Sequence, residues 1–298
     1  MGIASLNITI DLLLHRMLLC LIAPLNEINL WALGGIGLVA GLLGSMLGVG
    51  GGFLIVPMLT LALHLPIKVA IASSLVAIVA NSCTASGMYT RTRLTNIKLG
   101  LLLETATIPG AIIGGFTAAF IAPSILSALF GFMLIYAAYT MLARPYFMTE
   151  DNLTADNSSD PNNAHASLTS SLADLYYDQN LNRIVNYKAT HISTGLGTSF
   201  FAGILSSLLG VGGGLINVPV MHLIMGVPMK AAIATSTFII TITAATGALI
   251  YHYQGQVYPF IIAPLAIGIV IGSRIGVELT QRAGGIAGNS RSGCERKS

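Results

Sequence analysis

The chain has 298 residues, of which 54% are hydrophobic and 8% are charged, and its formal net charge is +3. Soluble proteins carry about 25% charged residues, so this composition excludes a soluble domain and indicates a membrane protein with several spans. The small net charge gives no argument for a nucleic-acid partner. The three cysteines are widely spaced and form neither a disulfide framework nor a metal motif.

The first half of the chain, residues 31–143, follows an N-terminal arm, residues 1–30, whose apolar run is interrupted by two basic residues. Its apolar segments predict a helix over 31–48, a short segment over 53–64, and helices over 67–90, 98–122 and 124–143. The short segment reaches about 18 Å as a helix, against about 30 Å for the hydrocarbon core of a bilayer. We therefore expect it to be a half-helix or a re-entrant segment.

Residues 144–190 are polar and acidic without helical periodicity, which predicts a linker loop between two halves. The second half, residues 191–282, predicts a helix over 191–210, a short segment over 215–226, and helices over 228–253 and 258–282. We align Gly268 and Gly272 with Gly110 and Gly114, an offset of 158. The hydrophilic tail, residues 283–298, has no counterpart to the helix over 124–143. We expect that the last helix is missing because the sequence is truncated or out of frame from about residue 283.

The two halves are copies of one unit. Residues 41–74 match residues 203–236 without gaps at 18 of 34 positions, including the runs 48–52 and 210–214, both Gly-Val-Gly-Gly-Gly. A period this long indicates a duplicated half. Basic residues flank the loop 91–98, whereas the equivalent loop 254–257 has none, so the two loops are expected on opposite sides of the membrane. The predicted fold is an all-α, polytopic helical bundle of two inverted-topology repeats, each with a glycine-broken half-helix.

Paired broken helices in inverted repeats are typical of secondary transporters, which bind substrate near the midplane between the repeats. Glycines have no side chain to block a ligand, and the half-helix after each run presents a positive dipole end that favours a small anion. The alternative is that the glycines only permit tight helix packing. The expected substrate-binding glycines are Gly48, Gly50, Gly51, Gly52, Gly210, Gly212, Gly213 and Gly214.

Four polar side chains complete the candidate substrate site. Asn81 lies in the middle of the helix over 67–90, and Asn217 adjoins the second glycine run. Each asparagine can line a pathway or bond across helices. Ser74 and Ser236 can donate hydrogen bonds to an oxyanion, and the alternative is that they bond back to the preceding turn of their own helix.

The charged residues at the helix ends are weaker candidates for a functional role. Lys68 and Lys230 lie in the first turns of equivalent helices, where they can attract an anion or extend to the membrane interface. Charges inside membrane spans are candidates for function. Because Glu104, Arg274 and Glu278 lie near the expected cytoplasmic helix ends, we expect them to extend to the interface or to pair. No histidine has metal-ligand spacing, so we assign no metal and no catalytic residue.

The segments 48–57 and 210–219 resemble the paired signature of the TauE/SafE family of sulfite-exporter-like membrane proteins. The pattern Pro-x-Lys-x-Ala-x-Ala-x-Ser that follows, at 66–74 and 228–236, also fits this family. The resemblance covers about 31–143 and 191–282. It implies transport of small sulfur-containing anions, such as sulfite or organosulfonates, across a bacterial inner membrane, without a cofactor.

We therefore expect a secondary transporter of the cytoplasmic membrane. Its expected partners are a small anionic substrate and the lipid bilayer, a proton is a candidate coupling ion, and the sequence defines no oligomeric state. A channel or cation carrier and a transport-inactive truncated scaffold are the alternatives. A membrane-embedded enzyme is disfavoured because the spans contain no nucleophile–base or metal constellation.

Overall fold

A computed structural model describes residues 30–91, 94–148, 173–178, 183–188 and 192–295. Within these ranges, six helices are long and apolar enough to cross a membrane. The expected all-α, multi-span fold is thereby confirmed. The N-terminal arm lies outside the described residues, apart from Leu30.

The elements follow the expected order. The first half comprises α2 (Leu30–Leu47), α3 (Gly52–Pro57), η2 (Met58–Ala62), α4 (Ile67–Arg91), α5 (Ile97–Phe120) and α6 (Pro123–Met148). The second half comprises α8 (Ile192–Leu209), α9 (Gly214–Pro219), η4 (Val220–Ile224), α10 (Met229–Tyr253) and α11 (Pro259–Glu295). The residues from 283 to 295, expected as a tail, continue the helix of α11.

Both short segments change from α-helical to π-helical geometry immediately after a proline. Pro57 ends α3 and precedes η2, and Pro219 ends α9 and precedes η4. A proline lacks the N–H that continues a regular α-helix, and π-helical turns accommodate such interruptions. The expected half-helices are therefore confirmed as short apolar helices, Gly52–Ala62 and Gly214–Ile224.

The linker contains a local exception to the all-α fold. Strands β1 (Ala173–Asp178) and β2 (Arg183–Lys188) pair antiparallel, with Ala173 opposite Lys188. The hairpin lies inside the segment predicted as a linker between the two halves. Tyr176 and Tyr177 in one strand and Ile184, Val185 and Tyr187 in the other are residues that favour extended structure.

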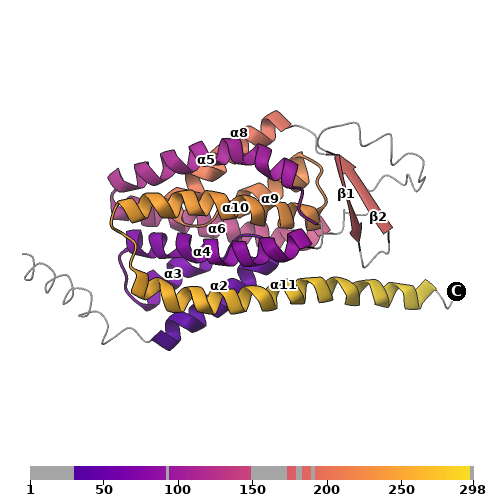
Figure 1. Cartoon of the computed structure of the whole chain (residues 1–298), viewed down its shortest axis with the longest axis horizontal. Helices are drawn as coiled ribbons and strands as arrows, with labels where there is room; N and C mark the ends of the chain where they lie inside the picture. Colours follow the sequence, from indigo (N-terminus) through magenta and orange to yellow (C-terminus); the bar gives the residue numbers. More distant parts are fainter. Residues whose placement is uncertain (1–29, 92–93, 149–172, 179–182, 189–191, 296–298) are drawn as a thin grey trace, which may run out of the picture.

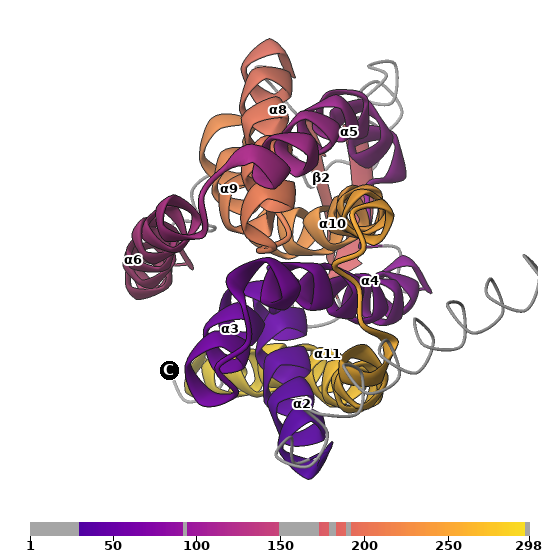
Figure 2. The same cartoon turned by 90° about the vertical axis from the view of Figure 1, so that its left-hand side faces the viewer.

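The helices form two groups that each mix the two halves of the sequence (Figure 2). The α11 group contains α2, α3, η2, α4 and α11, and the α5 group contains α5, α8, α9, η4 and α10. Thus α5, from the first half, packs on α8 and α10, whereas α11, from the second half, packs on α2 and α4. Helix α6 lies to one side of both groups (Figure 2).

Helices α5 and α11 each approach a helix of the other half closely, at glycines that have no side chain. A Cβ atom on Gly110 of α5 would overlap the carbonyl oxygen of Phe200, and one on Gly272 of α11 would overlap that of Leu38. Gly272 is 162 positions after Gly110, and Phe200 is 162 positions after Leu38. The expected alignment of Gly110 with Gly268 was therefore wrong by one helical turn, and Gly272 is the equivalent of Gly110. Glycines recur every four residues in α11, so a one-turn shift gives a similar sequence match.

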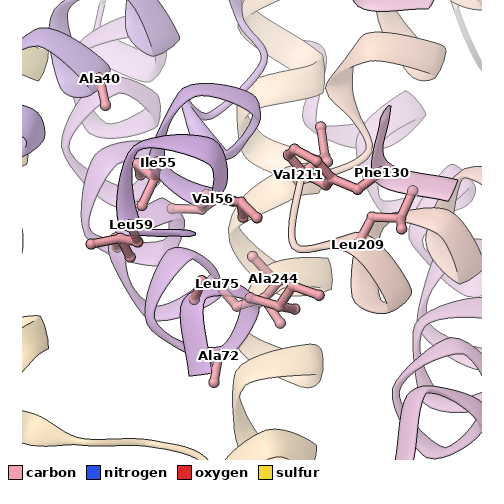
Figure 3. Packing of buried hydrophobic residues seen from close by; sticks show 14 of the residues in the cluster. Ala40, Ile55, Val56, Leu59, Ala72, Leu75, Phe130, Leu209, Val211 and Ala244 are labelled. Carbon is pink, nitrogen blue, oxygen red and sulfur yellow. The ribbon is translucent and has the colours of Figure 1, made fainter. Parts of the chain in front are cut away.

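The connections show the arrangement of the two copies. The connection from α4 to α5 and the connection from α10 to α11 lie at opposite ends of the bundle (Figure 1). Between the groups, α4 packs on α10. Figure 3 shows Leu75 of α4 beside Ala244 of α10, and Val56 of α3 near Val211 of the second glycine run. The apolar core therefore continues from one group into the other.

The glycine contacts predict a position-specific loss of stability. Gly37 and Gly35 both lie in α2, but a Cβ atom on Gly37 would overlap the carbonyl oxygen of Leu265, whereas one on Gly35 would meet nothing within 4 Å. Overpacking of this kind costs about 1–3 kcal/mol. We expect Gly37→Ala to lower the thermal unfolding midpoint in detergent and Gly35→Ala to leave it unchanged or raise it. Equal midpoints for the two variants would contradict this packing.

Candidate functional site

The two glycine runs have the same backbone conformation. Gly48, Gly50 and Gly51 have φ values of 68°, 85° and 84°, and Gly210, Gly212 and Gly213 have values of 68°, 89° and 66°. Positive φ is the left-handed region that costs other L-residues about 1–2 kcal/mol each. Each run therefore ends one membrane helix with a left-handed turn and starts a half-helix within a few residues.

The runs pack directly against each other. A Cβ atom on Gly52 would overlap the carbonyl oxygen of Gly210, and one on Gly214 would lie 2.5 Å from that of Gly48. These contacts are equivalent under the offset of 162 positions. The glycines in both runs are buried. The structure therefore brings the predicted glycines of the two halves into one crossing, defined here as residues 48–52 and 210–214.

Two serines hold this crossing by reciprocal hydrogen bonds. The Ser74 hydroxyl donates to the carbonyl oxygen of Gly210 at 2.9 Å, and the Ser236 hydroxyl donates to that of Gly48 at 3.0 Å. Each hydroxyl also lies 2.8–2.9 Å from a carbonyl of its own helix, as the alternative interpretation expected. The serines thus satisfy carbonyl groups that the helix ends at Gly48 and Gly210 leave without an intrahelical partner.

Asn81 binds the first glycine run from the side. Its side-chain amide donates to the carbonyl oxygen of Gly50 at 2.9 Å, and its main-chain oxygen accepts from Ser273 of α11 at 3.2 Å. Its Oδ1 atom is buried and has no partner among the described residues. Ser206, near Gly213 in the second run, also has a buried hydroxyl without a described partner. Sequence reasoning missed Ser206, because a serine next to a second serine in an apolar helix carries no distinctive signal.

The N–H groups at the start of α3 point to what the crossing can bind. Among the described residues, the N–H groups of Gly51, Gly52 and Phe53 have no acceptor. In the second copy, the N–H groups of Gly213 and Leu215 also have none. Unpaired N–H groups at a helix start, together with the helix dipole, favour an anion.

Two isoleucines cover the glycines from one side. Methyl groups of Ile78 in α4 and Ile240 in α10 lie 2.9 Å and 3.3 Å from the position of a Cβ atom on Gly50. Both side chains also lie 3.2–3.3 Å from the corresponding position on Gly212. Ile240 is 162 positions after Ile78, so the pair is equivalent in the two copies. The glycines of the crossing are buried, and this pair contributes to their cover. Apolar residues in a continuous apolar helix could not be singled out from the sequence.

The other predicted residues are more distant from this arrangement. Asn217 is buried in α9, where its Oδ1 atom accepts from Ser199 at 3.4 Å. The Lys68 ammonium group donates to the carbonyl oxygen of Ala119 near the end of α5, and Lys230 is exposed. Neither lysine is brought to the crossing.

Glu104 departs from expectation. It is 3% exposed and is buried between α5 and α10, where it accepts hydrogen bonds from Thr107 and Thr243. The expectation that it extends to the interface was wrong. The helix of α5 turns this residue toward α10, because Leu103 and Thr107 on the same side face the bundle.

Fold and site together define a helical, multi-pass membrane protein with two packed, glycine-broken half-helices. The sequence model of the family described as sulfite exporter TauE/SafE matches residues 33–287. The chain therefore belongs to the TauE/SafE family.

Relatives of the chain are described as membrane transporters. The Bacillus subtilis protein described as "Probable membrane transporter protein YunE" is 30% identical over 258 residues, covering 83% of this chain and 87% of that protein. A Methanocaldococcus jannaschii protein described as "Probable membrane transporter protein MJ0441" is 25% identical over 262 residues, covering 83% and 85%. No solved structure matches the chain. These names support membrane transport and do not specify a substrate for this chain.

The reciprocal serine bonds predict paired effects on stability. A hydrogen bond to a buried carbonyl contributes about 1 kcal/mol, so Ser74→Ala and Ser236→Ala should lower the thermal unfolding midpoint by similar amounts. Ser82→Ala is the matched control, because the buried Ser82 hydroxyl bonds to Ile78 and Val79 of its own helix. If Ser82→Ala lowered the unfolding midpoint as much as Ser74→Ala and Ser236→Ala, the hydrogen bonds between the two copies would add no measurable stability.

Proposed function

We propose that the chain is a secondary transporter that moves a small anion, sulfite or an organosulfonate, across the bacterial cytoplasmic membrane. The observation that carries this proposal is the crossing itself, where two buried glycine runs present unpaired N–H groups from half-helices of opposite copies. Irregular backbone at membrane depth occurs where it is buried in protein or lines a pathway. Membership of a family described as sulfite exporters supports the substrate class.

The proposed binding groups are main-chain N–H groups rather than charged side chains. A sulfite or sulfonate group has three oxygens that accept hydrogen bonds, and main-chain N–H groups at two facing half-helices can donate to them. Ser74 and Ser236 already donate to glycine carbonyls, so we assign them the role of holding the crossing in place. Asn81 has the same role toward Gly50.

The two copies are proposed to be inverted repeats that provide alternating access. The opposite positions of the α4–α5 and α10–α11 connections support this arrangement (Figure 1). We expect Ile78 and Ile240 to separate when substrate reaches the glycines, because both side chains lie against Gly50 and Gly212. Movement of the α5 group relative to the α11 group along the α4–α10 contact would separate them.

Transport by the purified chain tests this function. In proteoliposomes we expect uptake of radiolabelled sulfite or sulfoacetate above the level of protein-free liposomes. The Gly213 N–H group has no described acceptor, and a methyl group on this residue would lie 3.4 Å from the Cβ atom of Ser206 beside the second run. Gly213→Ala should therefore reduce uptake by about tenfold, the equivalent of about 1.4 kcal/mol.

Gly226→Ala is the matched control. Gly213 and Gly226 have φ values of 66° and 70°, so both variants incur the same backbone strain, and a Cβ atom is closer than 3.4 Å to nothing at either position. Gly226 lies in the turn after η4, outside the crossing. Equal uptake by the two variants would refute the site, and absence of uptake by the verified, inserted wild-type chain would refute the substrate class.

A further inference from the structure

A single buried carboxylate lies within the α5 group. Glu104 of α5 is 3% exposed, and among the described residues it has no ion-pair partner. The Thr107 hydroxyl lies 2.8 Å from Oε2 of Glu104, and the Thr243 hydroxyl of α10 lies 3.2 Å from Oε1. An isolated buried carboxylate is costly in a membrane span, and such residues are typical of ion or proton pathways.

Both threonines have a second acceptor within reach. The Thr243 hydroxyl lies 3.0 Å from the carbonyl oxygen of Ile239, and the Thr107 hydroxyl lies 3.3 Å from the main-chain oxygen of Glu104. An ionised carboxylate only accepts hydrogen bonds, whereas a protonated one also donates. With the carboxylate ionised, both hydroxyls donate to it. With a proton bound, the acid donates to Thr243, whose own hydroxyl turns to Ile239, so each state is satisfied by rotation of hydroxyl groups.

We infer that the Glu104 carboxyl group binds and releases the proton that couples transport to the proton gradient. This inference rests on the proposed transport function and adds the coupling ion and its residue. The step is a protonation of the carboxylate, with the proton taken from one side of the membrane and released to the other. A metal cation at this position would need more oxygen ligands than one carboxylate and two hydroxyls supply.

The carboxylate is connected to the elements that carry the glycine runs. Its partner Thr243 is 162 positions after Asn81, which donates to Gly50 of the first run. Thr243 therefore occupies the position that contacts a glycine run in the other copy. A change in the hydrogen bond of Thr243 acts on α10, which packs on α5, α8 and α9.

A second contact reaches α9 through α8. On α8, Gly195 lies against Met225 and Leu103, and Gly203 lies against the main chain of Thr107, one helical turn after Glu104. Ser199 lies midway between these glycines on the same face of α8, and its hydroxyl donates to Asn217 of α9. Buried polar groups thus extend from Glu104 toward the half-helix that follows the second glycine run.

The carboxylate has no equivalent in the α11 group. The positions 162 residues after Glu104 and Thr107 are Ala266 and Ile269, and the position 162 residues before Asn217 is Ile55. A requirement of the duplicated fold would be present in both copies. The carboxylate is present in one, as expected for a coupling site that only one group of helices needs.

Other titratable residues on the elements around Glu104 are placed differently. Helices α8 and α9 carry no titratable residue within their described bounds. Lys98 at the start of α5 is exposed, and the His222 ring of η4 lies 3.0 Å from the carbonyl oxygen of Val227. The titratable residues of α10 lie toward its two ends, more than a full helical turn from Thr243: Lys230, Tyr251, His252 and Tyr253.

Gradient-driven accumulation and exchange separate the coupling role from substrate binding. The probes are radiolabelled sulfite and sulfoacetate in proteoliposomes, corrected for protein-free liposomes. One coupled proton per anion gives about tenfold accumulation for each unit of pH difference. Glu104→Gln keeps one acceptor oxygen, its NH2 group can donate to the other threonine hydroxyl, and it cannot release a proton. We therefore expect it to retain exchange of internal for external anion and to lose accumulation. Glu104→Asp should keep accumulation at a lower rate.

Glu278→Gln is the control, since it removes an exposed carboxylate from α11 and should accumulate the probes like wild type. Accumulation by Glu104→Gln at the wild-type level would overturn the coupling role and leave the transport function intact. Accumulation driven by a sodium gradient at equal pH would also overturn it. Failure of wild type to transport either probe would instead overturn the proposed function.

Infrared difference spectroscopy tests proton binding without transport. In a pH titration, wild type should show a protonated-carboxyl band at acid pH that disappears as the pH rises. The band should be absent from Glu104→Gln and present in Glu278→Gln. A wild-type spectrum without this band, or a band that persists in Glu104→Gln, would overturn the assignment of the proton to Glu104.

Discussion

Main-chain polar groups in a membrane must be satisfied within the protein, and this constraint shapes the centre of the molecule. Each glycine run ends a membrane helix in the middle of the bundle and leaves carbonyl groups without intrahelical partners. The Ser74 and Ser236 hydroxyls supply the missing donors at Gly210 and Gly48, each from the opposite copy. Other donors come from the same copy: the Asn81 amide donates to Gly50. The Tyr89 and Tyr251 hydroxyls likewise donate to carbonyls near the ends of α2 and α8, within their own halves.

Glycine has different energetic roles in the crossing and in the helix pairs α2–α11 and α5–α8. In the helix pairs, Gly37 and Gly110 allow a helix to approach a neighbouring carbonyl, and their φ values are ordinary for a helix. In the crossing, Gly50 and Gly212 also need a left-handed backbone. Apolar side chains gain little from meeting one another in lipid, so backbone proximity and hydrogen bonds provide much of the association energy. Here both sources are concentrated along contacts between the two halves of the sequence.

The sequence predicted the helices, the half-helices and the two glycine breaks, because each has a strong local signal: apolar length, a proline, and three adjacent glycines. It could not predict which surfaces meet. Helices α5 and α11 each pack with helices of the other half through regularly spaced glycines. This spacing is equally compatible with a one-turn shift, as the equivalence of Gly110 and Gly272 demonstrates. Glu104 was misplaced for a related reason: distance from a helix end suggests proximity to the interface, whereas the direction of a side chain depends on neighbours such as Thr243. Ile78 and Ile240 are indistinguishable by sequence from the apolar residues around them.

The exchange of helices between the two groups has a consequence for how the protein is made. During synthesis, α5 is made before its partners α8 and α10. Helix α2 is made first among the described helices, whereas its partner α11 is made last. The glycine faces of α2 and α5 therefore meet lipid or a membrane chaperone during this interval. Such non-local pairing slows folding, since distant segments must meet before their contacts can form. The contacts that complete each group of helices therefore form only after the second half has been made.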